Sequence, residues 1–209
     1  MKKKKISGVT LLLIGLVIYI GNNYKDEINK YLAELNIIKE TSAYEEKSYN
    51  LEDIPGYDGV SEYVIINNNE PFFEEDDINI IAFEKYSDLD SLGRCGIAYA
   101  NIGPELMPTE ERESIGIVKP SGWHTVKYDI IDGKYLYNRC HLIGYQLTGE
   151  NANEKNLITC TRQMNVGAML DFENQVADYI NETNNHVLYR VTPIFKDNNL
   201  VASGVQIEA

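Results

Sequence analysis

The sequence has little of what zinc proteins and serine or thiol hydrolases need. Its 209 residues include only three histidines and three cysteines, and neither a C-x-x-C nor a G-x-S-x-G motif occurs. Zinc sites are built from clusters of histidine and cysteine, so no zinc ribbon or redox motif is predicted. A serine hydrolase with a nucleophile elbow is not indicated either.

Positive charge is also scarce. The chain carries 19 Lys and Arg against 32 Asp and Glu, for a net charge of −13. Tight, non-specific binding of nucleic acid normally rests on Lys and Arg at the phosphates, so the overall charge argues against it. A local basic cleft, or a metal that bridges to phosphate, is still compatible with this composition.

The N-terminus has the one long hydrophobic run. Four lysines precede the uncharged stretch from Ile6 to Gly21. This pattern is typical of a secretory signal or of a short membrane anchor, and the lack of an A-x-A-like cleavage site favours the anchor. Because the lysines should stay in the cytoplasm, we expect the rest of the chain to lie outside it.

The remaining chain predicts an α+β protein. We expect residues 1–21 to be the signal or anchor, 22–53 a stalk or linker, and 54–209 the globular domain. Strands dominate, with one long helix late in the chain. The expected elements are a strand over 62–69 that ends in an asparagine turn, a short helix capped by Thr109, a hairpin turn at Asp132-Gly133, a short strand over 156–160, a helix over 164–180, and strands over 186–195 and 201–209.

The three cysteines allow two interpretations. In an oxidising exterior one pair would form a disulfide, and Cys140 with Cys160 is the candidate. Alternatively, all three are small apolar residues of a reduced core.

The long helix places two polar residues beside its apolar stripe. With about 100° per residue, Asn165 and Glu173 each lie about 40° from Met169, at the edges of the face that should be buried. Buried polar groups need partners, which suggests a site. For Asn165 the alternative is a local cap at the helix start.

The strand before this helix carries a histidine. In an extended segment His141 and Arg139 point to one face and Cys140 to the other, so Cys140 and His141 cannot form a nucleophile–base pair. A strand that ends in histidine is followed by a polar loop, a short strand and the helix. This β-β-α unit is able to bring an imidazole and an amide oxygen to one point.

The residues "NRCH" at 138–141 resemble the D-R-G-H motif of the DNA/RNA non-specific endonucleases, the ββα-metal nucleases. The similarity continues through "NLIT" and "MNVGAMLDFE", and it is greatest to the secreted and surface-associated DNases of streptococci. The resemblance implies a ββα-metal nuclease fold with a central antiparallel sheet. It also implies a magnesium-dependent endonuclease that acts on DNA, with RNA as a further substrate, and in which Mn²⁺ substitutes for Mg²⁺.

The resemblance also assigns roles. His141 would be the general base, Asn165 the magnesium ligand, and Glu173 the holder of metal-bound water. Arg139 would support the site, and Asn156 would orient the loop. The residues that we expect to form the substrate-binding surface are Arg94, Lys127, Asn156 and Arg162.

Two positions depart from the family motif. Asn138 stands where the wider family has Asp, and Cys140 stands where it has Gly. A Cys would cost about 1–2 kcal/mol if that position needed a positive φ. These departures keep open an alternative function, a surface DNA-binding or adhesion module with impaired catalysis.

Overall fold

The computed structural model describes residues 54–56, 58–74, 77–78 and 81–209. The predicted anchor over 1–21 and the stalk over 22–53 lie outside the described residues. Within the described ranges, no helix is both long enough and apolar enough to cross a membrane.

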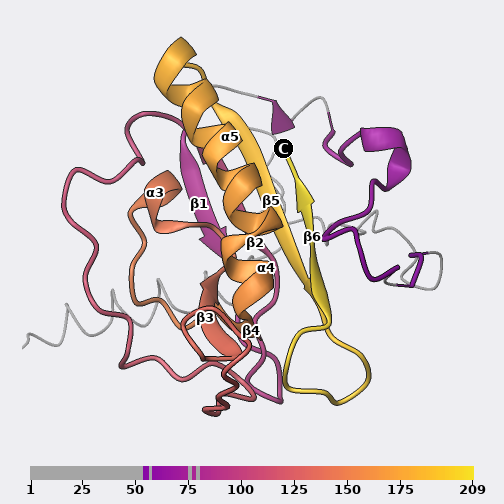
Figure 1. Ribbon diagram of the computed structural model, residues 1–209. Helices are drawn as coiled ribbons and strands as arrows, with labels where there is room; N and C mark the ends of the chain where they lie inside the picture. Colours follow the sequence, from indigo (N-terminus) through magenta and orange to yellow (C-terminus); the bar gives the residue numbers. More distant parts are fainter. Residues whose placement is uncertain (1–53, 57, 75–76, 79–80) are drawn as a thin grey trace, which may run out of the picture. The chain divides into compact units, whose positions relative to one another are not determined.

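Two antiparallel sheets form the framework (Figure 1). The larger sheet has the order β1-β2-β5-β6, and the smaller one pairs β3 with β4. The strands are β1 (Phe83–Tyr86), β2 (Ala98–Ile102), β3 (Tyr137–His141), β4 (Leu157–Thr161), β5 (Val187–Ile194) and β6 (Gly204–Glu208). The predicted mixture of helix with antiparallel sheet is confirmed.

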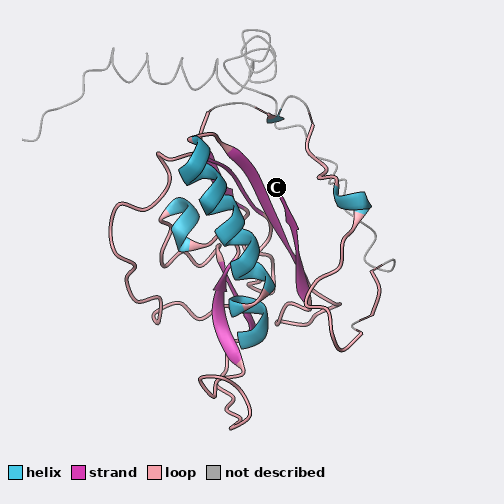
Figure 2. Ribbon diagram, turned by 45° about the horizontal axis from the view of Figure 1, so that its top comes forward, coloured by secondary structure: helices cyan, strands magenta, loops and turns pink. Residues whose placement is uncertain are grey.

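The helices lie on one face of the larger sheet. They are α3 (Tyr145–Thr148), α4 (Arg162–Val166) and α5 (Ala168–Thr183), and a 3-10 helix, η2 (Asn67–Asn69), lies beyond β6. In Figures 1 and 2, α5 runs across the four-stranded sheet. The shorter α4 contacts both β3 and β4, so the helix pair joins the small sheet to the large one.

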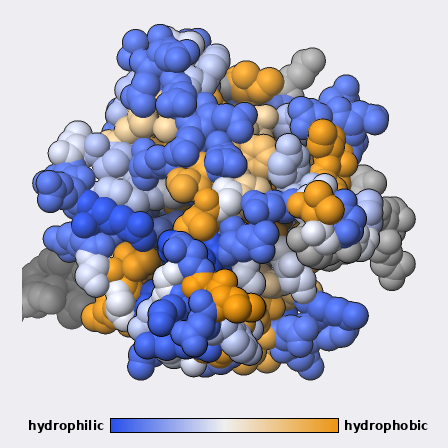
Figure 3. All heavy atoms as spheres, viewed as in Figure 1, coloured by the Kyte–Doolittle hydropathy of each residue, from blue (hydrophilic) through white to orange (hydrophobic). Residues whose placement is uncertain are grey.

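The core lies between α5 and the larger sheet. Val176, Ala177 and Ile180 are buried on α5, and Ala98 and Ala100 are fully buried on β2. Alanines on the strand allow the helix to come close, and the helix buries its apolar stripe there. The face that carries α5 is otherwise largely hydrophilic, with apolar side chains in separate patches (Figure 3).

Two of the expected elements are wrong. Residues 62–66 join no sheet, and Asn67, Asn68 and Asn69 all have positive φ values within η2. Asparagine tolerates this left-handed region, so the run bends the chain instead of closing a strand. The helix expected after Thr109 is absent, because residues 109–114 are polar and exposed and give a helix nothing to bury.

The predicted long helix is divided in two. Gly167 separates α4 from α5, with φ −98° and ψ −121°. The Thr161 hydroxyl caps α4 by accepting from the Met164 N–H at 3.2 Å. Asn165 is therefore not a helix cap, and its side chain belongs to a short helix with its own direction.

The turn at Asp132-Gly133 is confirmed. Gly133 has φ +68°, and the Tyr128 N–H donates to the Lys134 carbonyl at 2.9 Å. The strand before the turn is reduced to an isolated bridge between Lys127 and Tyr135.

A disulfide joins Cys140 to Cys160 across β3 and β4. The two Cα atoms lie 6.0 Å apart, within the range that a disulfide spans. The candidate pair is thus confirmed, while Cys95 is free and buried. Cys140 has no positive φ, so the expected cost of replacing glycine does not arise.

Reduction of this disulfide should lower the free energy of unfolding by about 3 kcal/mol, the usual value for a closed loop of this size. The measurement is a thermal melt with and without reductant. The control is Cys95→Ala, whose response to reductant should equal that of the wild type. Equal melting temperatures for the oxidised and reduced wild type would contradict the expectation.

Candidate active site

The imidazole of His141 lies at the end of β3 and is 7% exposed. Its Nε2 lies 2.7 Å from the carbonyl oxygen of Asn151. A carbonyl only accepts, so Nε2 carries the hydrogen and Nδ1 keeps the lone pair in the neutral ring. Burial lowers the pKa of His141, and the nearby charge of Arg112 lowers it further, against the hydrogen bond to Asn151.

Asn156 fixes the backbone that follows His141. Its side chain is fully buried; Oδ1 accepts from the Ile143 N–H and Nδ2 donates to the Ile143 carbonyl, each at 2.9 Å. The carbonyl of Asn156 also accepts from the Leu142 N–H at 2.9 Å. The Asn156 side chain is thus engaged with the backbone of the loop, and none of it is exposed for contact with a ligand.

Glu173 is buried on the inner side of α5, 8% exposed. Burial raises the pKa of this carboxyl to about 7, although hydrogen bonds from Gln146 and the Gly144 N–H and the charge of Arg112 act in the opposite direction. A Cβ at Gly144 would overlap the Glu173 carboxylate. Glycine is therefore needed three residues after His141 to let the carboxylate approach the loop.

Asn165 lies in α4, half-buried. Its side chain makes no hydrogen bond with any residue that the structure describes. Because α4 contacts β3 and β4, Asn165 belongs to the same β-β-α unit as His141. An amide oxygen that is partly shielded and unpaired is available to a ligand.

Arg139 holds a loop against β3. Its Nε donates to the Val118 carbonyl at 2.5 Å and Nη2 to the Gly116 carbonyl at 3.1 Å. The guanidinium also lies 3.8 Å from the ring centroid of Trp123. These contacts fix the Arg139 side chain between the loop at Gly116 and Val118 and the ring of Trp123.

The other predicted cations are already engaged. Arg94 pairs with Asp90 at 2.7 Å and donates to the carbonyls of Asp197 and Asn199. Arg162 pairs with Asp132 at 2.8 Å. The Lys127 ammonium lies 4.5 Å from the ring centroid of Tyr135. None of these contacts of Arg94, Arg162 and Lys127 is with His141.

Arg112 is a candidate site residue that the sequence did not predict. It is exposed, and it is the one arginine among the described residues with no hydrogen bond or ion pair. Its charge acts on both His141 and Glu173. Within "TEERES" nothing distinguishes it from a solvated charge, and only the fold brings it to the site. The Tyr145 hydroxyl anchors this segment by donating to the Glu110 carbonyl at 2.8 Å.

The site is therefore a buried imidazole, a buried carboxyl, an unpaired amide and a free guanidinium. No group of three or more His, Cys, Asp or Glu residues in the described part of the chain could hold a metal by itself. A family model described as DNA/RNA non-specific endonuclease matches residues 76–209. The chain belongs to this family. It is an endonuclease, in agreement with the resemblance of its motifs.

Solved structures of nucleases share the fold. NucA from Streptococcus agalactiae, with magnesium bound, is 24% identical and has a TM-score of 0.60, over 68% of this chain and 69% of that chain. NucA without metal gives a TM-score of 0.59 over the same shares. The Sda1 nuclease with a bound zinc ion is 28% identical, with a TM-score of 0.54 over 60% of this chain and 67% of that one. The search of curated proteins found no match.

The buried carboxyl of the endonuclease gives a prediction for stability. The folded-state pKa of Glu173 is about 7, above the ordinary 4.5, so the folded protein binds this proton more tightly than the unfolded chain does. Stability from this group is full below pH 4.5 and is lost as the pH rises through about 7. In EDTA, the melting temperature of Glu173→Gln should therefore rise relative to that of the wild type as the pH is raised from about 5 to about 8.

Glu182→Gln, at an exposed position of the same helix, is the matched control. It should follow the wild type at both pH values. The same pH response for the two variants would show that the Glu173 carboxyl is not held as described.

Proposed function

We propose that the chain is a magnesium-dependent, sequence-non-specific endonuclease that hydrolyses DNA, and also RNA, with His141 as general base. The observation that carries the proposal is the state of His141. Its ring is buried, its pKa is lowered, and the Asn151 carbonyl holds Nε2. A base must be neutral to work, and this environment favours the neutral ring at physiological pH.

His141 takes a proton from the attacking water at Nδ1. The hydrogen bond from Nε2 to Asn151 fixes the ring plane, and the carbonyl oxygen stabilises the imidazolium that results. The fixed loop after β3 keeps the ring in place, because Asn156 holds Ile143 from both sides. The fixed ring and its lowered pKa support the assignment of His141 as general base.

Asn165 would hold magnesium, with Glu173 contributing through water. An amide oxygen is a hard ligand, and magnesium keeps several waters and dehydrates reluctantly, so one direct protein ligand suits it. The unpaired amide fits this role, and the magnesium bound to NucA supports the same ion here. Mn²⁺ should substitute. When bound, the ion would neutralise charge on the phosphoryl oxygens.

Arg112 supplies positive charge to a protein that is otherwise acidic. Its free guanidinium is suited to a phosphate oxygen, which it would contact through charge-assisted hydrogen bonds. Because the other arginines are engaged with protein groups, we assign the phosphate contact at the site to Arg112. Arg139 acts indirectly by holding the loop at Gly116 and Val118.

The enzyme acts outside the cytoplasm in this proposal. The disulfide between Cys140 and Cys160 supports an oxidising location, because cytoplasmic thiols are kept reduced. Residues 1–21 would anchor the chain in the membrane and 22–53 would form the stalk. The nuclease domain would then follow from residue 54.

His141→Ala should lower the rate of plasmid nicking by about 10²–10⁴-fold, the usual contribution of a positioned general base. The wild-type rate should fall on the acid side as His141 takes up a proton. The controls are His124→Ala and His186→Ala, which should keep most activity, with a thermal melt for each variant. Nicking by His141→Ala at the wild-type rate would exclude His141 as the base.

Removal of the metal with EDTA should abolish nicking, and added Mg²⁺ or Mn²⁺ should restore it. Asn165→Ala should lose most activity at every Mg²⁺ concentration while its melting temperature stays near that of the wild type. Full activity in EDTA would contradict the metal requirement. A protein that binds DNA in the presence of Mg²⁺ and never nicks it would be the binding module instead.

A further inference from the structure

An N-terminal arm, residues 54–56 and 58–74, precedes the part of the chain that the family model matches. It runs along the outside of β6 (Figure 1). Its C-terminal end is fixed there: the Phe72 N–H donates to Glu208 at 2.8 Å, and Arg190 donates to the Phe72 carbonyl at 3.2 Å. The arm therefore belongs to the folded domain although it lies outside the family's shared region.

Glu62 of this arm reaches the junction of α4 and α5. Its Oε1 accepts from the Gln163 side-chain amide at 3.1 Å, and its Oε2 accepts from the Ala168 N–H at 3.0 Å. Gly167, the N-cap of α5, has no side chain, so Glu62 supplies the cap from a distant part of the chain. A negative charge is also favoured at the start of a helix.

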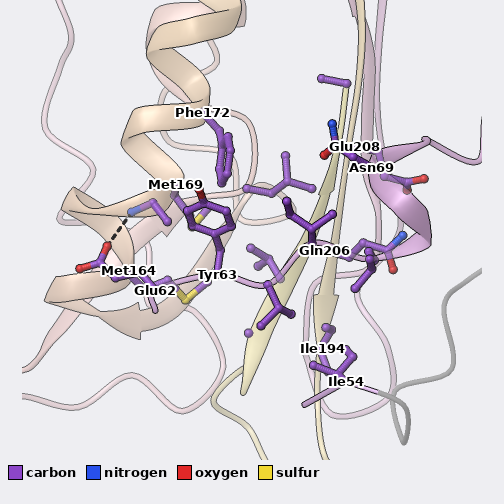
Figure 4. A pocket seen from close by; sticks show the side chains of 18 of the residues that line it. Ile54, Glu62, Tyr63, Asn69, Met164, Met169, Phe172, Ile194, Gln206 and Glu208 are labelled. Atoms are coloured by element: carbon purple, nitrogen blue, oxygen red, sulfur yellow. Dashed lines mark hydrogen bonds between the residues drawn. The ribbon is translucent and has the colours of Figure 1, made fainter. Parts of the chain in front are cut away.

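Two further features, at Gly167 and Tyr63, accompany the contact between Glu62 and the junction of α4 and α5. A Cβ at Gly167 would overlap the Glu62 carboxylate and would lie 2.7 Å from the Gln163 carbonyl oxygen, so glycine leaves the room that Glu62 occupies. The Tyr63 ring packs edge-on against Phe172 of α5, with the centroids 5.1 Å apart. Figure 4 shows Tyr63 against Phe172 and Glu62 beside α4.

The two groups that Glu62 holds lie on either side of Asn165. Gln163 is two residues before Asn165 in α4, and Ala168 begins α5, which carries Glu173. The bridge therefore sets the direction of α4 relative to α5. We propose that Glu62 is a positioning residue of the endonuclease, which orients Asn165 relative to Glu173 for metal binding. This inference rests on the proposed role of Asn165.

The arm and the helix pair border a cavity of about 1210 Å³, so the core between α5 and the sheet does not extend to this point. Glu62 is itself exposed. Loss of the bridge should consequently leave the core intact and change the geometry at Asn165. The effect should appear in metal affinity more than in stability.

The experiment compares full-length Glu62→Ala with Glu70→Ala. Glu70 has the same charge in the same arm, and its side chain makes no hydrogen bond or ion pair with the described residues. Glu62→Ala should raise the Mg²⁺ concentration for half-maximal nicking about three- to tenfold, because Asn165 is no longer held in the geometry for metal binding. The rate at saturating Mg²⁺ should stay near that of the wild type, and the melting temperature should fall only by the small amount that follows the loss of a helix cap.

Metal binding is also measured without cleavage. Mn²⁺ binding to the His141→Ala variant with a short DNA duplex is followed by the electron paramagnetic resonance of free Mn²⁺. Adding Glu62→Ala to this variant should weaken Mn²⁺ binding by the same factor. Glu62→Gln keeps one acceptor oxygen and should weaken binding less. Glu70→Ala should leave binding unchanged.

Equal metal dependence for Glu62→Ala and Glu70→Ala, in nicking and in Mn²⁺ binding, would overturn the inference about the arm. The proposed function would then still stand if Asn165→Ala is inactive and EDTA stops nicking. Full activity of Asn165→Ala would overturn the proposed metal site and, with it, the role given to Glu62.

Discussion

The hydrogen bonds between the Asn156 side chain and the backbone of Ile143 are the constraint on which the site depends. They join the residue just before β4 to the backbone just after β3, with no exposure to water. An amide that satisfies both a backbone donor and a backbone acceptor in a buried position is costly to displace. The position of His141 and the approach of Glu173 to Gly144 both follow from this fixed loop.

Burial then determines the charge states of the site. His141 is driven toward its neutral form and Glu173 toward protonation, because low polarity disfavours either charge. Arg112 lowers both pKa values, since a positive neighbour opposes the imidazolium and favours the carboxylate. In the proposed function, a cation and a phosphate that enter the site would meet one neutral imidazole, one carboxyl with a pKa of about 7 and one free guanidinium.

The sequence predicted the elements that have a strong local pattern. The His141 strand, the turn at Gly133, the last two strands and the amphipathic part of α5 could all be recognised, because alternation, turn residues and helical spacing are local signals. The break at Gly167 was not predicted, and the Glu62 carboxylate that accepts from the Ala168 N–H there comes from more than a hundred residues away in the chain. Arg112 was missed because only the fold brings its charge close enough to act on His141 and Glu173.

The central claim is that His141, the proposed general base, is neutral with its lone pair on Nδ1. The nitrogen chemical shifts of its imidazole, followed by NMR as the pH is lowered from neutral, test this most directly. The account predicts hydrogen on Nε2, a free Nδ1, and a pKa below the ordinary value of 6.5. Hydrogen on Nδ1 in the neutral ring, or a ring still doubly protonated at neutral pH, would contradict it.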